Sequence, residues 1–424
     1  MDRPLRFCMI TTFYPPYNFG GDGIFVRRLS NALACRGHSV DVIHCADAYR
    51  LSNPEPVNGY EDHPNVTVHR LRSGFGFLSP LATHQTGRPL FKSAKIKKIL
   101  SKGFDVIHYH NISLIGGPRI LHYGEGIKLY TMLEYWLVCP TSVLFKYNHA
   151  PCTQPACFTC CLTYKRPPQL WRHSRLLSSA VKNVDAFIAP SDFSKKIHER
   201  MGLKAPMVYI PYFVSAETAE RPNEDFKNRL AKPYFLFVGR LEKLKGLHTL
   251  LPIFENYTKA RLLVAGTGAD ELRLRQLAQG AANIKFLGHQ TEAELQALYR
   301  NAVAVIVPSI CYDASPLVTY ESFTNETPVI VRNLGGMAQP IQESGGGFVY
   351  ENERELLTAM DLLLADPSYR NRLGARGHKA LSEKWSIDAH LKSYFELIDQ
   401  IATARCASSG SDFHPPGSPC VPLI

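Results

Sequence analysis

The stretch SICYDASPLVTYESFTNETPVIV, residues 309–331, combines two carboxylates with a helix signal and a run of strand-forming residues. Pro316 suits the first turn of a helix, because its ring fixes φ and its missing N–H is not needed there. Asp313 should then lie in the loop before this helix, and Glu321 about a turn and a half inside it. The positive end of the helix would face whatever Asp313 faces, which is a place suited to a phosphate. The alternative interpretation is a surface helix with an acidic cap.

Strand-like and helix-like segments alternate on both sides of this stretch, which is typical of parallel α/β architecture. One series starts at RFCMITTFYPP, residues 6–16, and a second starts at YFLFVGR, residues 234–240, after a polar stretch. We expect an α/β protein with two doubly wound, Rossmann-like domains that face each other across a crevice, where such sheets bind ligands. The expected units are residues 1–211, residues 212–387, a helix over 388–403 that crosses back to the first domain, and a disordered Ser-, Gly- and Pro-rich tail over 404–424.

The bulk composition describes an ordinary globular protein. A chain of 424 residues exceeds what one hydrophobic core usually serves, and 45% hydrophobic with 20% charged residues excludes a disordered chain. Neither a window of about 18 apolar residues nor a signal peptide is evident, so we expect a cytoplasmic protein. The net charge of +11 favours anionic partners such as nucleotides, phospholipid head groups or nucleic acid.

Residues suited to anion binding follow several expected strands. Gly20 and Gly21 stand between the first strand and its helix, where backbone N–H groups can approach an anion. Arg240 and Lys245 offer one forked and one point cation, a combination suited to a diphosphate. Further candidates at strand ends are Gly266, Gly288 and His110. Ordinary glycine turns, a solvated basic loop and a structural histidine are the alternative interpretations.

In their order and spacing, these motifs resemble glycosyltransferase family 4 on the GT-B fold, over essentially residues 5–400. The motifs that carry the resemblance are Pro15–Pro16 followed by Gly20–Gly21, RGHSVDVI (36–43), VGRLEKLKG (238–246), AGTGAD (265–270), FLGH (286–289), VIVPS (305–309) and the acid-x7-acid segment ending in ESFTNETPVI. The resemblance implies a retaining, hexosyltransferase-like enzyme that moves a sugar from a nucleotide-sugar donor to an acceptor hydroxyl, in polysaccharide or glycolipid biosynthesis. A nucleotide-sugar epimerase of the same fold and a catalytically inactive sugar-nucleotide-binding protein stay open as alternatives.

The resemblance also implies residue roles, with the acceptor side in the first domain and the nucleotide sugar in the second. Arg240 and Lys245 would hold the donor diphosphate and stabilise charge on the leaving nucleotide. Glu321 would accept hydrogen bonds from both ribose hydroxyls, and Asp313 would contact hydroxyls of the transferred sugar. The remaining implied contacts are the amides of Leu317 and Val318 and the glycines Gly20, Gly21 and Gly266 on the donor, Gly288 and His289 on the base, and His110 on the sugar side.

Two features of this implied chemistry are specific to the chain. Family members look independent of a catalytic metal, with the donor phosphate helping to deprotonate the acceptor. Asp313 stands where the family usually has the longer Glu, and Pro316 replaces a usual glycine, which removes one N–H donor.

Five of the eleven cysteines fall within residues 139–161, an insertion in the first domain. The Cys157-x2-Cys160 pair has a familiar zinc-ligand spacing, and a tetrahedral site needs four thiolate or imidazole groups. The expected ligands of a structural zinc are Cys139, Cys152, Cys157 and Cys160, with Cys161 and His149 as substitutes. Free buried thiols and a redox or disulfide role are the alternatives. A nucleic-acid module is disfavoured, because no recognition-helix pattern accompanies the cluster.

The segment FKSAKIKKILSKGF, residues 91–104, predicts a basic amphipathic helix. Ile96, Ile99 and Leu100 fall on one face at helical spacing and would pack on the sheet. The lysines expected to point outward are Lys92, Lys95, Lys97, Lys98 and Lys102. They form either a solvated face or a contact with anionic lipid, each worth about 1 kcal/mol near the surface. Lipid contact would make the protein peripheral on the inner face of the membrane, beside a lipid-linked saccharide acceptor.

Overall fold

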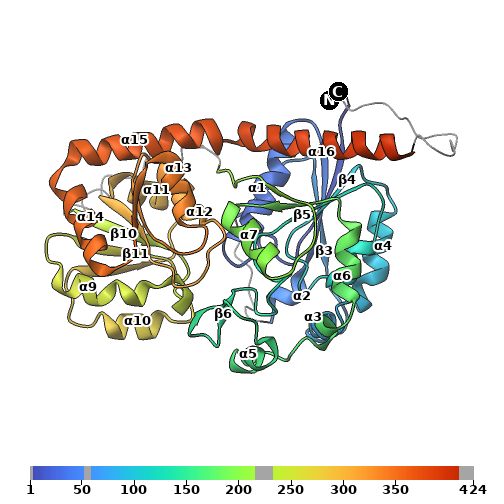
Figure 1. Ribbon diagram of the computed structural model, residues 1–424, viewed down its shortest axis with the longest axis horizontal. Coiled ribbons are helices and arrows are strands. Elements are labelled where there is room, and N and C mark those ends of the chain that lie inside the picture. The colour runs from blue at the N-terminus through green and yellow to red at the C-terminus, as the bar shows by residue number, and fades with distance from the viewer. Residues whose placement is uncertain (1–2, 52–58, 215–232, 410–424) are drawn as a thin grey trace.

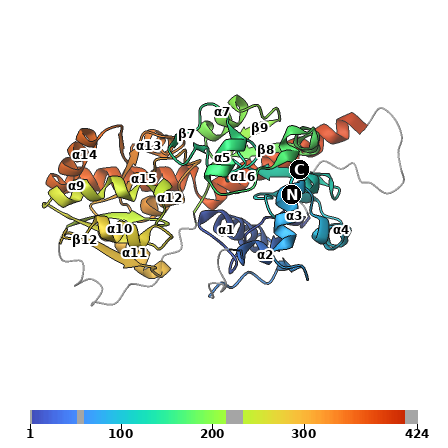
Figure 2. The ribbon, with the colours of Figure 1, turned by 90° about the horizontal axis from the view of Figure 1, so that it is seen from below.

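The computed structural model describes residues 3–51, 59–214 and 233–409, which form two parallel sheets with helices on both sides of each (Figures 1 and 2). This arrangement confirms the predicted α/β fold with two doubly wound halves. Most of the polar stretch predicted between the two series, residues 215–232, lies outside the described part of the chain.

The first sheet has the strand order β3-β2-β1-β4-β5-β8-β9, and every pair in it is parallel. Its strands are β1 (Arg6–Ile10), β2 (Ser39–Cys45), β3 (Val66–Leu71), β4 (Val106–Tyr109), β5 (Ile127–Thr131), β8 (Ala186–Ala189) and β9 (Met207–Tyr209). The central strands β4, β5 and β8 are buried throughout, as expected where helices cover both faces of a parallel sheet. The order reverses between β1 and β4, which is where such sheets bind ligands.

The second sheet has the order β12-β11-β10-β13-β14-β15, again parallel throughout. Its strands are β10 (Tyr234–Val238), β11 (Arg261–Ala265), β12 (Ile284–Gly288), β13 (Ala304–Val307), β14 (Val329–Arg332) and β15 (Gly347–Tyr350). The order reverses between β10 and β13, so loops after these two strands meet at one edge of the sheet.

The helices follow the alternation expected from the sequence. Those of the first half are α1 (Gly21–Cys35), α2 (Ala46–Tyr49), α3 (Leu78–Thr86), α4 (Ser93–Leu100), α5 (Cys157–Thr163), α6 (Leu176–Ala180) and α7 (Asp192–Arg200). Those of the second half are α9 (Leu251–Asn256), α10 (Glu271–Leu277), α11 (Glu292–Asn301), α12 (Leu317–Thr324), α13 (Ala338–Ser344), α14 (Glu353–Ala365), α15 (Pro367–Lys384) and α16 (Ile387–Ser409). In the described residues, none of these helices is both long enough and apolar enough to span a bilayer.

The last helix, α16, lies along the first sheet, opposite the side where α3 is found (Figure 1). Tyr394 shares a 3.0 Å hydrogen bond with His108 of β4, and Arg405 forms a 2.6 Å ion pair with Asp185. The sequence predicted a disordered tail from residue 404, but α16 continues to Ser409, and its ion pair through Arg405 holds this end against the first domain. Residues 410–424 of that predicted tail lie outside the described range.

The predicted basic helix is α4, and one of its expected outward lysines is not exposed. Ile96 and Leu100 are buried, as the helical spacing predicts, and Lys95, Lys97 and Lys98 are exposed. Lys92 instead belongs to the short 3₁₀ turn η1 (Leu90–Lys92) and is 1% exposed. Its ammonium group is buried because Ser79 and Thr83 of α3 accept its hydrogen bonds, at 2.9 and 3.2 Å.

Candidate active site

The glycine loop before α1 touches the second domain. A Cβ atom at Gly20, where φ is +67°, would lie 3.4 Å from Arg240 Nε, and one at Gly21 would lie 3.0 Å from Leu317 Cδ1. Asn18 fixes the loop, because its Nδ2 donates to the Gly20 carbonyl at 2.7 Å and its Oδ1 accepts from a backbone amide in the first turn of α1. Because these two glycines lack side chains, the first domain can approach Arg240 and the start of α12, both of which the sequence predicted as parts of the site.

Lys245 and Asp313 form an ion pair at the carboxyl ends of β10 and β13. Lys245 Nζ lies 2.8 Å from Asp313 Oδ2, and the hydroxyl of Ser309 donates to the same oxygen at 2.9 Å. Burial by itself would raise the pKa of Asp313, but Lys245 and Ser309 outweigh burial and lower it. Burial would likewise lower the pKa of Lys245, but the neighbouring carboxylate raises it. Both groups are therefore held in their charged forms.

Glu321 on α12 receives hydrogen bonds from both domains. Arg28 of α1 approaches Oε1 with its Nη2 at 3.2 Å, and the Tyr299 hydroxyl of α11 donates to Oε2 at 3.1 Å. The sequence predicted neither partner, since Arg28 is one of two adjacent arginines in an amphipathic helix with no motif of its own. Glu321 therefore lies where the two halves of the molecule meet.

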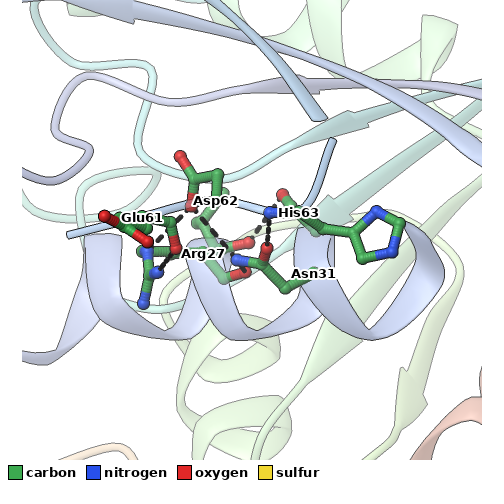
Figure 3. Close-up of polar contacts among 7 residues, drawn as sticks. Arg27, Asn31, Glu61, Asp62 and His63 are labelled. Atoms are coloured by element: carbon green, nitrogen blue, oxygen red, sulfur yellow. Dashed lines mark hydrogen bonds and ion pairs between the residues drawn. The ribbon is translucent and has the colours of Figure 1, made fainter. Parts of the chain in front are cut away.

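The orientation of α1, which carries Arg28, is fixed from its other side (Figure 3). Arg27 Nε pairs with Asp62 Oδ1 at 2.8 Å, and Asn31 donates to the same carboxylate at 3.1 Å. The Asn31 side chain also accepts from the backbone amide of His63 at 2.6 Å. The segment before β3 is thus fastened to the helix that reaches the second domain.

Two carboxyl groups that the sequence analysis missed lie on the first-domain side. Asp22 is in the first turn of α1, and burial raises its pKa to about 6 although Arg240 and Lys245 act in the opposite direction. Glu134 follows β5, and burial together with the charge of Asp22 raises its pKa to about 8. Its Oε1 is buried and has no hydrogen-bond partner among the residues that the structure describes. The sequence signal that could have found these two residues is their position after strand ends, where parallel α/β sheets bind ligands.

His110 lies immediately after β4, as expected, and is fully enclosed. Its ring lies 4.1 Å from that of His108 between centroids and contacts Phe25 of α1 edge-on. Burial lowers the pKa of His110 to about 3, so the imidazole is neutral. Within the described chain, neither of its ring nitrogens has a hydrogen-bond partner.

The other predicted donor contacts are spread along the second sheet. Gly266 packs tightly, because a Cβ atom there would lie 2.0 Å from the Gly239 carbonyl oxygen, and its own amide donates to the Gly288 carbonyl at 2.8 Å. Gly288 ends the edge strand β12 and the exposed His289 follows it, away from the Lys245–Asp313 pair in the strand order. Leu317 and Val318 form the first turn of α12.

The cysteine insertion forms a small hairpin, β6 (Phe145–Lys146) and β7 (Ala150–Pro151), followed by α5. The four predicted ligands, Cys139, Cys152, Cys157 and Cys160, line one cavity of about 20 Å³. In residues 3–51, 59–214 and 233–409, no group of three or more His, Cys, Asp or Glu is arranged to hold a metal ion, and the cysteines there form no disulfide. The insertion also reaches the second domain, since Lys243 donates to the Asn148 carbonyl at 2.7 Å.

Two family models match successive parts of the chain. The model described as Glycosyltransferase Family 4 matches residues 19–218, and the model described as Glycosyl transferases group 1 matches residues 220–380. The chain therefore belongs to the group 1 glycosyltransferases, which confirms the resemblance drawn from its motifs.

Similar proteins cover nearly the whole length of the chain. An uncharacterised glycosyltransferase of Methanocaldococcus jannaschii is 25% identical over 405 residues, which are 91% of this chain and 95% of that protein. The O-antigen chain mannosyltransferase C of Escherichia coli is 23% identical over 93% of this chain and 98% of its own length.

Solved structures confirm the GT-B fold. Sucrose-phosphate synthase from Thermosynechococcus elongatus superposes with a TM-score of 0.73 at 21% identity, covering 94% of this chain and all of that one (100%). Anabaena HepE in complex with UDP and glucose gives a TM-score of 0.65 at 14% identity, covering 93% of this chain and 100% of its own.

Proposed function

We propose that this glycosyltransferase moves a hexose from a nucleotide-sugar donor to an acceptor hydroxyl with retention of anomeric configuration, in polysaccharide or glycolipid synthesis. The observation that carries the proposal is the meeting of cations and a carboxylate where the two domains touch. Arg240 and Lys245 are suited to a diphosphate, and Glu321 is suited to a pair of ribose hydroxyls. The mannosyltransferase relative and the UDP complex of a protein with this fold support the same substrate class.

The donor would be held mainly by the second domain. A diphosphate near Lys245 would share its ammonium group with Asp313, which Lys245 and Ser309 keep charged and available for hydroxyls of the sugar. The amides that open α12 at Leu317 and Val318 would add partial positive charge toward the same phosphates. Charge that develops on the leaving nucleotide is thereby stabilised by groups already in place.

The transfer itself breaks the bond between the anomeric carbon and the donor phosphate oxygen, whose electron pair leaves with the nucleoside diphosphate. The acceptor oxygen bonds to the anomeric carbon on the same face, and its proton passes to a donor phosphate oxygen. Glu134 is mostly protonated near neutral pH, so it would donate a hydrogen bond to the acceptor from the first domain. His110, which is neutral and enclosed, would line the sugar side.

A panel of nucleotide sugars tests this proposal. We expect one or more donors to raise the melting temperature of the purified protein and to be hydrolysed slowly, or transferred when a saccharide acceptor is added. Proton NMR of the first product should show the anomeric configuration of the donor. If no nucleotide sugar binds or reacts, the proposed function is wrong, and an inverted product would refute retention alone.

A structural zinc in the cysteine insertion is a separate proposal. Three of the four lining cysteines are buried, Cys157 is half-buried, and the backbone amide of Tyr147 donates to Cys160 Sγ at 3.4 Å. The donor set fits zinc chemically, because thiolates are its preferred structural ligands. The thiols are not arranged as a coordination shell in this structure, so binding would require them to turn inward to the cavity they share.

A further inference from the structure

An exposed apolar patch lies on the first domain around α3. Its members are Phe75, Phe77, Leu78, Leu81, Leu90 and Phe91. Phe77 is 63% exposed and Phe75 is 57% exposed, and the rings of Phe75 and Phe91 stack with centroids 4.4 Å apart. Single exposed apolar side chains are common, but six large ones on α3, on η1, which packs against α3, and on the loop before them indicate an interaction surface. We call these six residues the aromatic patch.

The patch is supported from beneath. Lys92 anchors η1 to α3 through its bonds to Ser79 and Thr83, so Leu90 and Phe91 are turned outward. The chain around Gly74 and Gly76 has open space, since added Cβ atoms there would meet nothing within 4 Å. The patch is therefore a presented surface and not the wall of an internal cavity.

The two sequence stretches that carry the patch and pack beside it contain bases and no acids. Residues 63–104 and 135–184 contain fourteen Lys and Arg and no Asp or Glu, which exceeds the net charge of +11 of the entire chain. The exposed basic residues in the first of these stretches are Arg70, Arg72, Arg88, Lys95, Lys97, Lys98 and Lys102. Lys95 donates to the Arg72 carbonyl at 3.0 Å, which ties α4 to the loop that carries Phe75. The aromatic patch thus has a basic rim.

We propose that this face docks on an anionic lipid bilayer, with the aromatic patch in the interface and the basic rim on the head groups. Apolar side chains flanked by bases, with no carboxylate in the same segments, fit a bilayer whose surface is negative and whose interior is apolar. The lysine contact expected from the sequence included Lys92, which is buried and cannot reach lipid. The proposed contact therefore centres on the phenylalanines and leucines, and the remaining bases surround them.

The position of the patch would bring the acceptor side of the site close to the bilayer, an inference that rests on the proposed function. The loop to α3 follows the carboxyl end of β3, and the glycine loop, His110 and Glu134 follow the carboxyl ends of β1, β4 and β5. All lie at one edge of a parallel sheet, whereas α16 lies on the opposite side of the first domain (Figure 1). A bilayer on the patch would lie next to the acceptor side of the site, so the acceptor would be a lipid-linked saccharide.

Co-sedimentation with vesicles tests the docking. The wild-type protein should bind vesicles of equal parts phosphatidylcholine and phosphatidylglycerol, bind pure phosphatidylcholine vesicles weakly, and be released by added salt. The combined change Phe75→Ser, Phe77→Ser and Phe91→Ser should weaken binding at least about tenfold, because the apolar side chains no longer enter the interface.

A charge variant and a matched control distinguish binding through the basic rim from binding through the net charge of the protein. The combined change Arg88→Gln, Lys95→Gln and Lys98→Gln should weaken binding about a hundredfold, at about a factor of five for each base. The control removes three exposed bases of the second domain and α16, by Lys285→Gln, Arg354→Gln and Lys392→Gln. It should leave binding nearly unchanged.

Each outcome decides the docking separately from the catalytic proposal. Absence of wild-type binding to anionic vesicles, or equal losses in the rim and control variants, would overturn the docking surface and point to a protein partner or to unspecific attraction. Donor hydrolysis in solution should persist in the aromatic and rim variants, with circular dichroism showing that they are folded. If wild-type protein binds vesicles but uses no nucleotide sugar, the docking stands and the proposed function fails.

Discussion

Replacing Glu321 with alanine should weaken binding of the donor by about 30- to 150-fold. The two carboxylate oxygens accept from Arg28 at 3.2 Å and from Tyr299 at 3.1 Å, and the side chain is 29% exposed. A hydrogen bond to a charged group is worth about 1.5–3 kcal/mol, and partial exposure places each ribose contact at or below the lower end. A total of about 2–3 kcal/mol for two hydroxyls converts to that change in Kd.

The competing explanation is that Glu321 acts only through its ion pair with Arg28. Both side chains are more than a fifth exposed, so this pair contributes less than about 1 kcal/mol. Arg28→Met should therefore change the donor Kd by less than about fivefold, while Glu321→Gln, which keeps the shape, should fall between wild type and Glu321→Ala. Calorimetric titration with the donor that emerges from the panel measures all three. Wild-type affinity in Glu321→Ala, or an equal loss in Arg28→Met, would refute the ribose assignment.

Three further predictions concern the diphosphate, a buried acid and the cysteines. Arg240→Ala and Lys245→Ala should each lower kcat by about a hundredfold or more in steady-state assays while the melting temperature stays close to wild type, and near-normal turnover would remove that residue from the diphosphate site. Because the pKa of Glu134 is raised to about 8 in the fold, the folded state binds more protons than the unfolded state between the two pKa values, and its stability falls as pH rises through this window. Glu134→Gln should therefore melt at a higher temperature than wild type at about pH 8 and at the same temperature at about pH 4, and a constant difference would contradict the burial of this acid. Elemental analysis should find about one zinc per chain, lost in Cys157→Ser but kept in the surface control Cys35→Ser, and a metal-free wild type of full stability would rule zinc out.

Local sequence patterns were sufficient for much of the architecture. The apolar runs at residues 7–10 and 234–238 predicted the strands β1 and β10, because strands covered on both faces need side chains that are apolar almost throughout. Pro316 predicted the start of α12, which begins at the next residue, because a fixed φ acts locally. The order of such motifs also indicated the family, since each reflects one turn or strand end and none depends on distant parts of the chain.

The tertiary structure alone decided which groups share the site and how they are charged. Arg28 and Glu321 meet although 293 positions separate them, because the contact depends on how two domains pack. Lys92 looked like one more surface lysine and is buried, since two hydroxyls of α3 accept hydrogen bonds from its ammonium group. The position of Glu134 after a strand end pointed to the ligand-binding edge of the sheet, but only burial in the folded chain raises its pKa to about 8. The free energy of a charge depends on everything packed around it in space, whereas a sequence pattern records only the periodicity and backbone preferences of one segment.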